Sequence, residues 1–79
     1  MELENKLKLN QGDKLIEVSH KMKGPLQETD VYKYNIVDQN ENIVGYVDHT
    51  DHTSIKGFQR TQTATQYDID RKVVLDITW

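Results

Sequence analysis

Hydrophobic and polar residues alternate along much of this chain with a period of two, which is typical of half-buried β-strands. Residues 14–22 show the pattern first: Ile16, Val18, His20 and Met22 alternate with more polar neighbours. In one regular strand these four side chains would share a face of a sheet. We therefore expect a strand over 14–22.

The segment before this strand has a similar pattern. Leucines at positions 3, 7 and 9 favour a strand over residues 3–9, although a short helix is also compatible with them. Residues 10–13 contain Asn, Gly and Asp, which favour a turn. A hairpin of 3–9 with 14–22 is the simplest interpretation, and the polar residues 24–30 are expected to form a loop.

The clearest hairpin joins residues 31–38 to residues 42–50, because both segments are rich in β-branched and aromatic residues. A two-residue turn at Asn40-Glu41 would fix the register, although a longer loop is also compatible. The pairs that follow from the short turn are Asp38 with Ile43, Val37 with Val44, Ile36 with Gly45, Tyr34 with Val47 and Lys33 with Asp48.

Two more strands complete the chain. Residues 54–67 are rich in Thr and Gln, and neither face of their middle is strongly apolar, which is typical of an edge strand or a solvent-facing strand. Residues 67–74 resemble a common hairpin turn, with Arg71 where such turns often place Gly. The strongest core strand is predicted over 72–79, with one face formed by Val73, Leu75, Ile77 and Trp79.

These elements predict an all-β fold in one domain, residues 1–79. It is a small antiparallel meander of five or six strands, as a curled sheet or a small barrel, with little or no helix. An open sheet of this size leaves a face to cover, and a homodimer is one way to cover it.

Composition narrows the function classes. The chain has no cysteine, which excludes disulfides, thiol nucleophiles and Cys-ligated metals, and no cofactor is predicted. No stretch approaches the ~20 apolar residues of a membrane span, and the start lacks a signal-peptide layout. We therefore expect a soluble, cytoplasmic protein.

The charge is uneven along the chain. The net charge is −3, but residues 25–55 carry six acids and a single Lys. This acidic middle disfavours nucleic-acid binding and is compatible with a basic protein partner, with a bound cation or with a role in solubility alone. The Thr/Gln segment 59–66 could also pair with another chain by strand addition. The candidate partner contacts are Asp38, Glu41, Asp48, Asp51 and Arg60.

A doubled Asp-His-Thr sequence at 48–53 is the one local cluster of metal-ligand residue types. Imidazole and carboxylate from His49, His52, Asp48 and Asp51 could hold a divalent metal. The two histidines would converge only if the chain turned around Thr50-Asp51. The alternatives are a solvated turn between strands and a pH-sensitive interface.

Catalysis finds little support in the sequence. Ser, His and Asp are present, but no G-x-S-x-G motif and no Gly-rich phosphate loop accompany them, so no enzyme is predicted. Tyrosines could offer stacking platforms to nucleic-acid bases, with cations near the phosphates. The residues considered for this role are Tyr32, Tyr34, Tyr46, Lys33, Lys56 and Arg60.

The function predicted from the sequence is therefore a non-enzymatic protein-binding module. In its sharper form it is a small acidic inhibitor or regulator that blocks a basic surface of its partner. The alternatives are a metal-binding domain at residues 48–52 and a small barrel that binds single-stranded nucleic acid.

Overall fold

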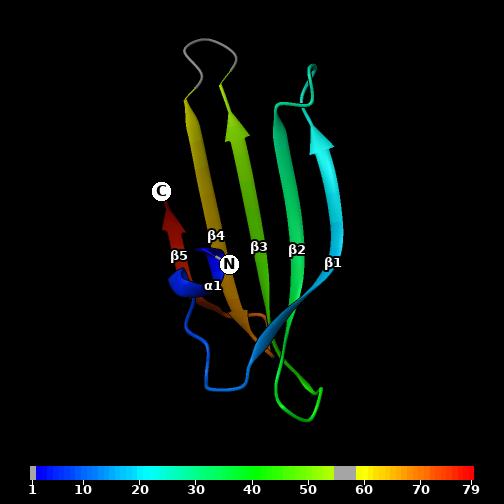
Figure 1. The fold of residues 1–79 in the computed structure, drawn as a ribbon, viewed down its shortest axis with the longest axis vertical. Coiled ribbons are helices and arrows are strands. Elements are labelled where there is room, and N and C mark those ends of the chain that lie inside the picture. The colour runs from blue at the N-terminus through cyan, green and yellow to red at the C-terminus, as the bar shows by residue number, and fades with distance from the viewer. Residues whose placement is uncertain (1, 55–58) are drawn as a thin grey trace.

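Five antiparallel strands pair in chain order as one open sheet, and a short helix lies against one of its faces (Figure 1). The computed structural model describes residues 2–54 and 59–79. The all-β meander predicted from the sequence is confirmed, as an open sheet rather than a barrel. Its elements are α1 (Glu2–Lys6), β1 (Lys14–Lys23), β2 (Thr29–Val37), β3 (Ile43–Thr53), β4 (Arg60–Asp68) and β5 (Val73–Thr78).

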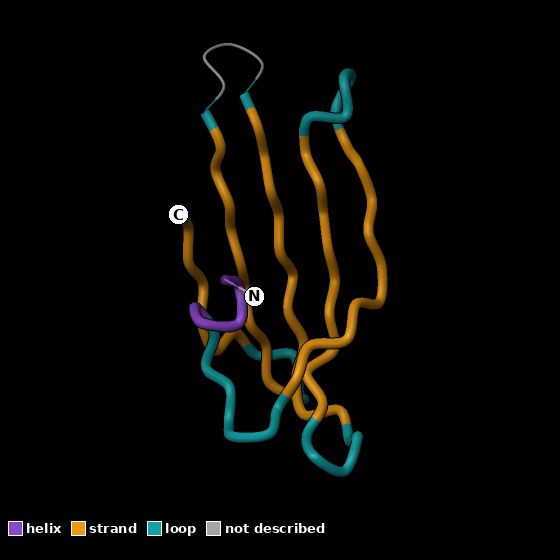
Figure 2. Tube along the Cα trace, viewed as in Figure 1, coloured by secondary structure: helices purple, strands orange, loops and turns teal. Residues whose placement is uncertain are grey.

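The N-terminal segment is a helix followed by a loop, so the strand predicted over residues 3–9 is wrong (Figure 2). Leu3 is 3% exposed, because the helix presses it onto the sheet. The backbone N–H of Lys8 donates to the Gln66 side chain at 2.8 Å, and the Gln66 amide donates back to the Lys8 carbonyl at 2.8 Å. The segment therefore crosses a sheet face instead of pairing along an edge.

Three β-bulges interrupt the sheet, and each inserts a valine. The register shifts leave Val18 in β1, Val44 in β3 and Val74 in β5 without a direct partner. A bulge reverses the face on which the residues beyond it lie, relative to a regular strand. Ile16 and His20 consequently lie on opposite faces, and so do Val73 and Leu75, whereas the sequence pattern predicted one shared face for each set.

The two hairpin turns 38–42 and 68–72 have the same construction. Each begins with an Asp whose backbone N–H bonds the carbonyl four residues on, and whose carboxylate accepts two backbone N–H groups of the turn. The fourth residue of each turn, Glu41 or Arg71, has a φ of 64°. The first loop is therefore longer than the predicted two residues.

The longer loop changes the predicted register only near the turn. The pairs Tyr34–Val47, Lys33–Asp48 and Ile36–Gly45 are confirmed, but Val37 opposes Ile43 instead of Val44. Of the two alternatives predicted for residues 54–67, the edge strand is wrong, because β4 lies between β3 and β5. Residues 55–58 of that prediction lie outside the described residues. The edges of the sheet are β1 and β5.

The two faces of the sheet differ. The helix face, on which α1 packs, carries most of the buried side chains, among them Ile36, Val47 and Ala64. The open face carries the alternate residues, and no other element in the described ranges packs on it. The strands β1–β4 extend well past α1 and the short β5, which gives the molecule extents of 44 × 22 × 20 Å (Figure 1).

Candidate functional site

Strand β3 runs straight through the doubled Asp-His-Thr sequence, so the turn predicted there is wrong. Residues 48–53 pair with β2 on one side and with β4 on the other. Regular alternation places His49 and Asp51 on the helix face, and Asp48 and His52 on the open face. The four residues of the predicted metal site therefore do not come together.

The two histidines of this sequence already have different surroundings. His52 is exposed, and its Nδ1 lies 2.6 Å from the Thr29 hydroxyl. His49 is 8% exposed, and its Nε2 lies 3.0 Å from Oε1 of Gln62. Among residues 2–54 and 59–79, no three His, Asp or Glu side chains converge as a metal site would require. Geometry gives the metal hypothesis no support.

Aromatic rings form a ladder across the helix face that the sequence pattern did not predict. His20, Tyr32, His49 and Trp79 come from β1, β2, β3 and the residue after β5. Successive ring centres are 4.3, 5.4 and 5.7 Å apart, with interplanar angles of 10°, 21° and 2°. The register explains the first two contacts, because Tyr32 opposes both His20 and His49.

Trp79 closes the ladder beneath the N-terminal segment. Lys6 of α1 places its ammonium group 5.1 Å from the centre of the Trp79 ring. Such cation–π contacts contribute about 0.5–1 kcal/mol at exposed sites. The helix therefore contacts Trp79 at the end of the ladder.

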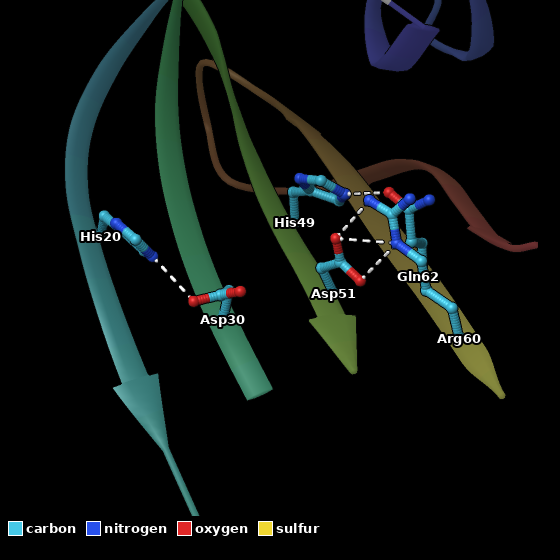
Figure 3. Close-up of polar contacts among 6 residues, drawn as sticks. All are labelled: His20, Asp30, His49, Asp51, Arg60 and Gln62. Atoms are coloured by element: carbon cyan, nitrogen blue, oxygen red, sulfur yellow. Dashed lines mark hydrogen bonds and ion pairs between the residues drawn. The ribbon is translucent and has the colours of Figure 1, made fainter. Parts of the chain in front are cut away.

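Two side-chain contacts with aspartates, His20–Asp30 and Arg60–Asp51, lie on the same face as the ladder (Figure 3). His20 lies 3.0 Å from a carboxylate oxygen of Asp30. The Arg60 guanidinium donates to both oxygens of Asp51, with Nε at 2.9 and 3.1 Å and Nη2 at 2.5 Å. These donated hydrogen bonds are the main reason that the pKa of the Asp51 carboxyl lies below its usual range.

The acidic residues proposed as partner contacts do not form one surface. Asp38 uses its carboxylate to hold its own turn, and Glu41 is exposed in that turn. Asp51 is bound by Arg60 on the helix face. Asp48 lies on the open face, 3.7 Å from Lys33. The acidic middle of the sequence is thus divided between one end and both faces of the sheet.

The predicted strand addition at residues 59–66 is also restricted by the fold. Residues 63–67 of β4 pair with β5, and the backbone of Gln62 exchanges two hydrogen bonds with Trp79, each 2.8 Å long. Most of this segment therefore has its backbone paired on both sides.

The open face carries a row of side chains that runs across all five strands, which we call the cross-strand row. Each member directly opposes the next on the neighbouring strand. Its two ends are apolar and exposed, with Ile16 at 45% and Val73 at 61%. The row consists of Ile16, Asn35, Tyr46, Tyr67 and Val73.

A shallow groove of about 350 Å³ follows the centre of this row. The bulged Val18, which is 59% exposed, forms one side of the groove. Arg71 forms the other, with its guanidinium 4.0 Å from the centre of the Tyr46 ring. The open face thus combines exposed aliphatic groups with two tyrosines and an arginine, the residue types that often carry binding energy at protein interfaces.

Tyr67 is further fixed by its neighbours on the open face. Burial and the nearby Asp48 carboxylate, which also hydrogen-bonds the phenol, raise the pKa of Tyr67 above its usual value. The Tyr67 phenol therefore stays neutral at physiological pH. Sequence reasoning missed Tyr67 and Arg71 because their significance depends on strand pairing, although the unusual Arg in the turn was visible.

Comparison with models of known protein families, with curated proteins and with solved structures finds no match. Within the part of the chain that the structure describes, no helix is long and apolar enough to cross a membrane. The argument for function therefore depends on the residues of the open face and the helix face themselves.

Proposed function

We propose that this protein is a non-enzymatic protein-binding module, and that the open face of its sheet is the surface that binds the partner. The observation that carries the proposal is the cross-strand row. Its apolar ends are exposed to water, and two partly exposed tyrosines lie between them, a residue type that is enriched at the centres of protein interfaces. No member of the row is needed to cover the core beneath α1.

This proposal moves the binding surface from the acidic residues 25–55, predicted from the sequence, to the open face of the sheet. Asp38 and Asp51 are engaged in contacts within the protein, so neither is presented to a basic partner. The open face instead offers a central groove with a rigid floor. Tyr46 is held by Arg71, and such a preorganised aromatic group loses little conformational freedom on binding.

A paired set of variants tests the surface. Ile16→Thr with Val73→Thr makes both ends of the row polar while it keeps β-branched side chains that suit a strand. Leu26→Thr with Ile69→Thr makes a matched control, because these residues are 70% and 51% exposed in connecting segments. Immobilised wild type, test variant and control are each incubated with lysate of the source cell, and captured proteins are quantified by mass spectrometry.

The expected result is one protein that wild type and control capture equally and that the open-face variant captures about tenfold less. Capture that is the same for all three proteins would overturn the proposal. Light scattering on the purified chain adds a second criterion. A dimer that dissociates in the Ile16→Thr/Val73→Thr variant alone would assign the open face to a second copy instead of a different protein.

A further inference from the structure

The charges of the open face identify the chemistry of the partner, and this inference rests on the proposed function. Cations gather on the β1–β2 side of the face. Cross-strand pairing places them on it, since Lys14, Lys21 and Lys23 oppose Val37, Val31 and Thr29, and Lys33 opposes both Ser19 and Asp48. All four side chains are exposed. We call Lys14, Lys21, Lys23 and Lys33 the lysine group.

The open face as a whole is basic although the protein is acidic. The lysine group and Arg71 give five cations, against the two acids Asp48 and Asp76. The formal charge of this face is therefore +3, and the rest of a chain of net charge −3 carries −6. Such an asymmetry orients the molecule in the field of a charged partner.

Both acidic side chains of the open face have neighbours within the protein. Asp48 contacts Lys33 and the Tyr67 phenol, and Asp76 accepts a hydrogen bond from the Thr65 hydroxyl at 3.1 Å. In contrast, Lys14, Lys21 and Lys23 form no ion pair with any residue that the structure describes. Three exposed ammonium groups thus remain available to a partner.

We infer that the open face binds an acidic protein surface, with carboxylates of the partner meeting the lysine group and apolar side chains of the partner meeting Ile16, Val18 and Val73. Complementary charge of this kind gives specificity and speeds association more than it adds affinity. The side chains of the cross-strand row then supply most of the affinity.

Nucleic acid is the other polyanion that a basic face with tyrosines could attract, and the geometry favours it less. Bases bind such platforms by stacking on exposed ring faces. One side of the Tyr46 ring is occupied by Arg71, and the negative charge of Asp48 acts on the Tyr67 phenol and would repel phosphate. The exposed side chains of Ile16 and Val73 can pack against apolar side chains of a protein partner.

NMR titration of the full chain with three probes tests the inference. The probes are a short peptide of alternating Glu and Leu, the same peptide with Lys in place of Glu, and oligo(dT). We expect the Glu peptide to shift the amide signals of the cross-strand row, with an affinity that falls as salt rises. Lys21→Gln with Lys23→Gln should weaken its binding about fivefold. Lys8→Gln, an exposed lysine of the N-terminal segment, should leave the binding unchanged.

The other outcomes separate this inference from the proposed function. Stronger binding of the Lys peptide to the same row would overturn the acidic partner and leave the protein-binding face intact. Binding of oligo(dT) with no response to either peptide would overturn both. If neither peptide nor oligo(dT) shifts the row, the acidic partner is rejected, whereas the capture experiment decides the function independently.

Discussion

Arg71 holds its guanidinium 4.0 Å above the Tyr46 ring while its own backbone adopts a φ of 64°. A left-handed conformation costs a non-glycine residue about 1–2 kcal/mol, and a cation–π contact returns about 0.5–1 kcal/mol. The side chain thus offsets part of the strain of the turn. Glu41, at the corresponding position of the turn 38–42, has the same φ, and its side chain makes no such ring contact within the described residues.

The two hairpin turns, 38–42 and 68–72, should respond differently to the same substitution. Glu41→Gly should stabilise the protein by about 0.5–1 kcal/mol, because relief of the strain exceeds the extra entropy that Gly gives the unfolded chain. Arg71→Gly should stabilise it less or not at all, because the contact with Tyr46 is lost as well. Urea unfolding of the two variants measures the difference, and equal effects would show that the Arg71–Tyr46 contact contributes nothing.

The Asp51–Arg60 ion pair predicts a dependence of stability on pH. The folded protein holds the Asp51 carboxyl at a pKa below its ordinary value of 3.8. The contact therefore stabilises the fold above that pH, and the stabilisation disappears as the pH falls through the lower pKa of the folded state. Arg60→Gln should cost about 0.5–1 kcal/mol at about pH 7, since the Arg60 side chain is largely exposed, and almost nothing at about pH 2.

Denaturant unfolding of wild type and Arg60→Gln at several pH values measures this convergence. Lys33→Gln is the matched control, because its contact with Asp48 is a single one of 3.7 Å between two well-exposed side chains. Its effect should be smaller at every pH. A difference between wild type and Arg60→Gln that persists unchanged into acid would show that packing of Arg60, and not its charge, stabilises the fold.

The burial of Leu3 predicts how much α1 contributes to the stability of the fold. Leu3→Ala removes a side chain that is 3% exposed, and large-to-small changes at buried leucines cost about 2–5 kcal/mol. The loosened helix should also uncover Trp79, the only tryptophan, and shift its fluorescence to longer wavelength. Leu26→Ala, at a residue 70% exposed, should change neither stability nor fluorescence. A Leu3→Ala protein as stable as wild type would mean that α1 does not hold the sheet.

The strands were predictable because alternation and β-branched residues report a pleated sheet directly. The pairs Tyr34–Val47 and Lys33–Asp48 followed from the central hairpin alone. Face assignments failed beyond Val18 and Val74, because a bulge adds one residue and carries no periodic signal. The strand predicted for residues 3–9 failed because leucines at 3 and 7 also suit one side of a helix, and the contact of Lys8 with Gln66 decides between the two.

The candidate site was less accessible to sequence reasoning than the fold. A sequence shows that residues 25–55 are acidic, but it does not show that pairing sends their carboxylates to different faces. It equally does not show that lysines spread from position 14 to position 33 share one face. The cross-strand row draws one residue from each strand, so no local window contains it.

The order of the strands bears on how this chain reaches its folded state. Every strand pairs with its neighbour in the sequence, so each pairing closes only a short loop and loses little chain entropy. The bonds between Lys8 and Gln66 instead join residues 58 positions apart. Formed in the unfolded chain, this contact would close a long loop at a high entropic cost, whereas after assembly of the sheet it closes only the short connection from Lys8 to β1. Docking of the N-terminal segment is therefore expected to follow assembly of the sheet on which it rests.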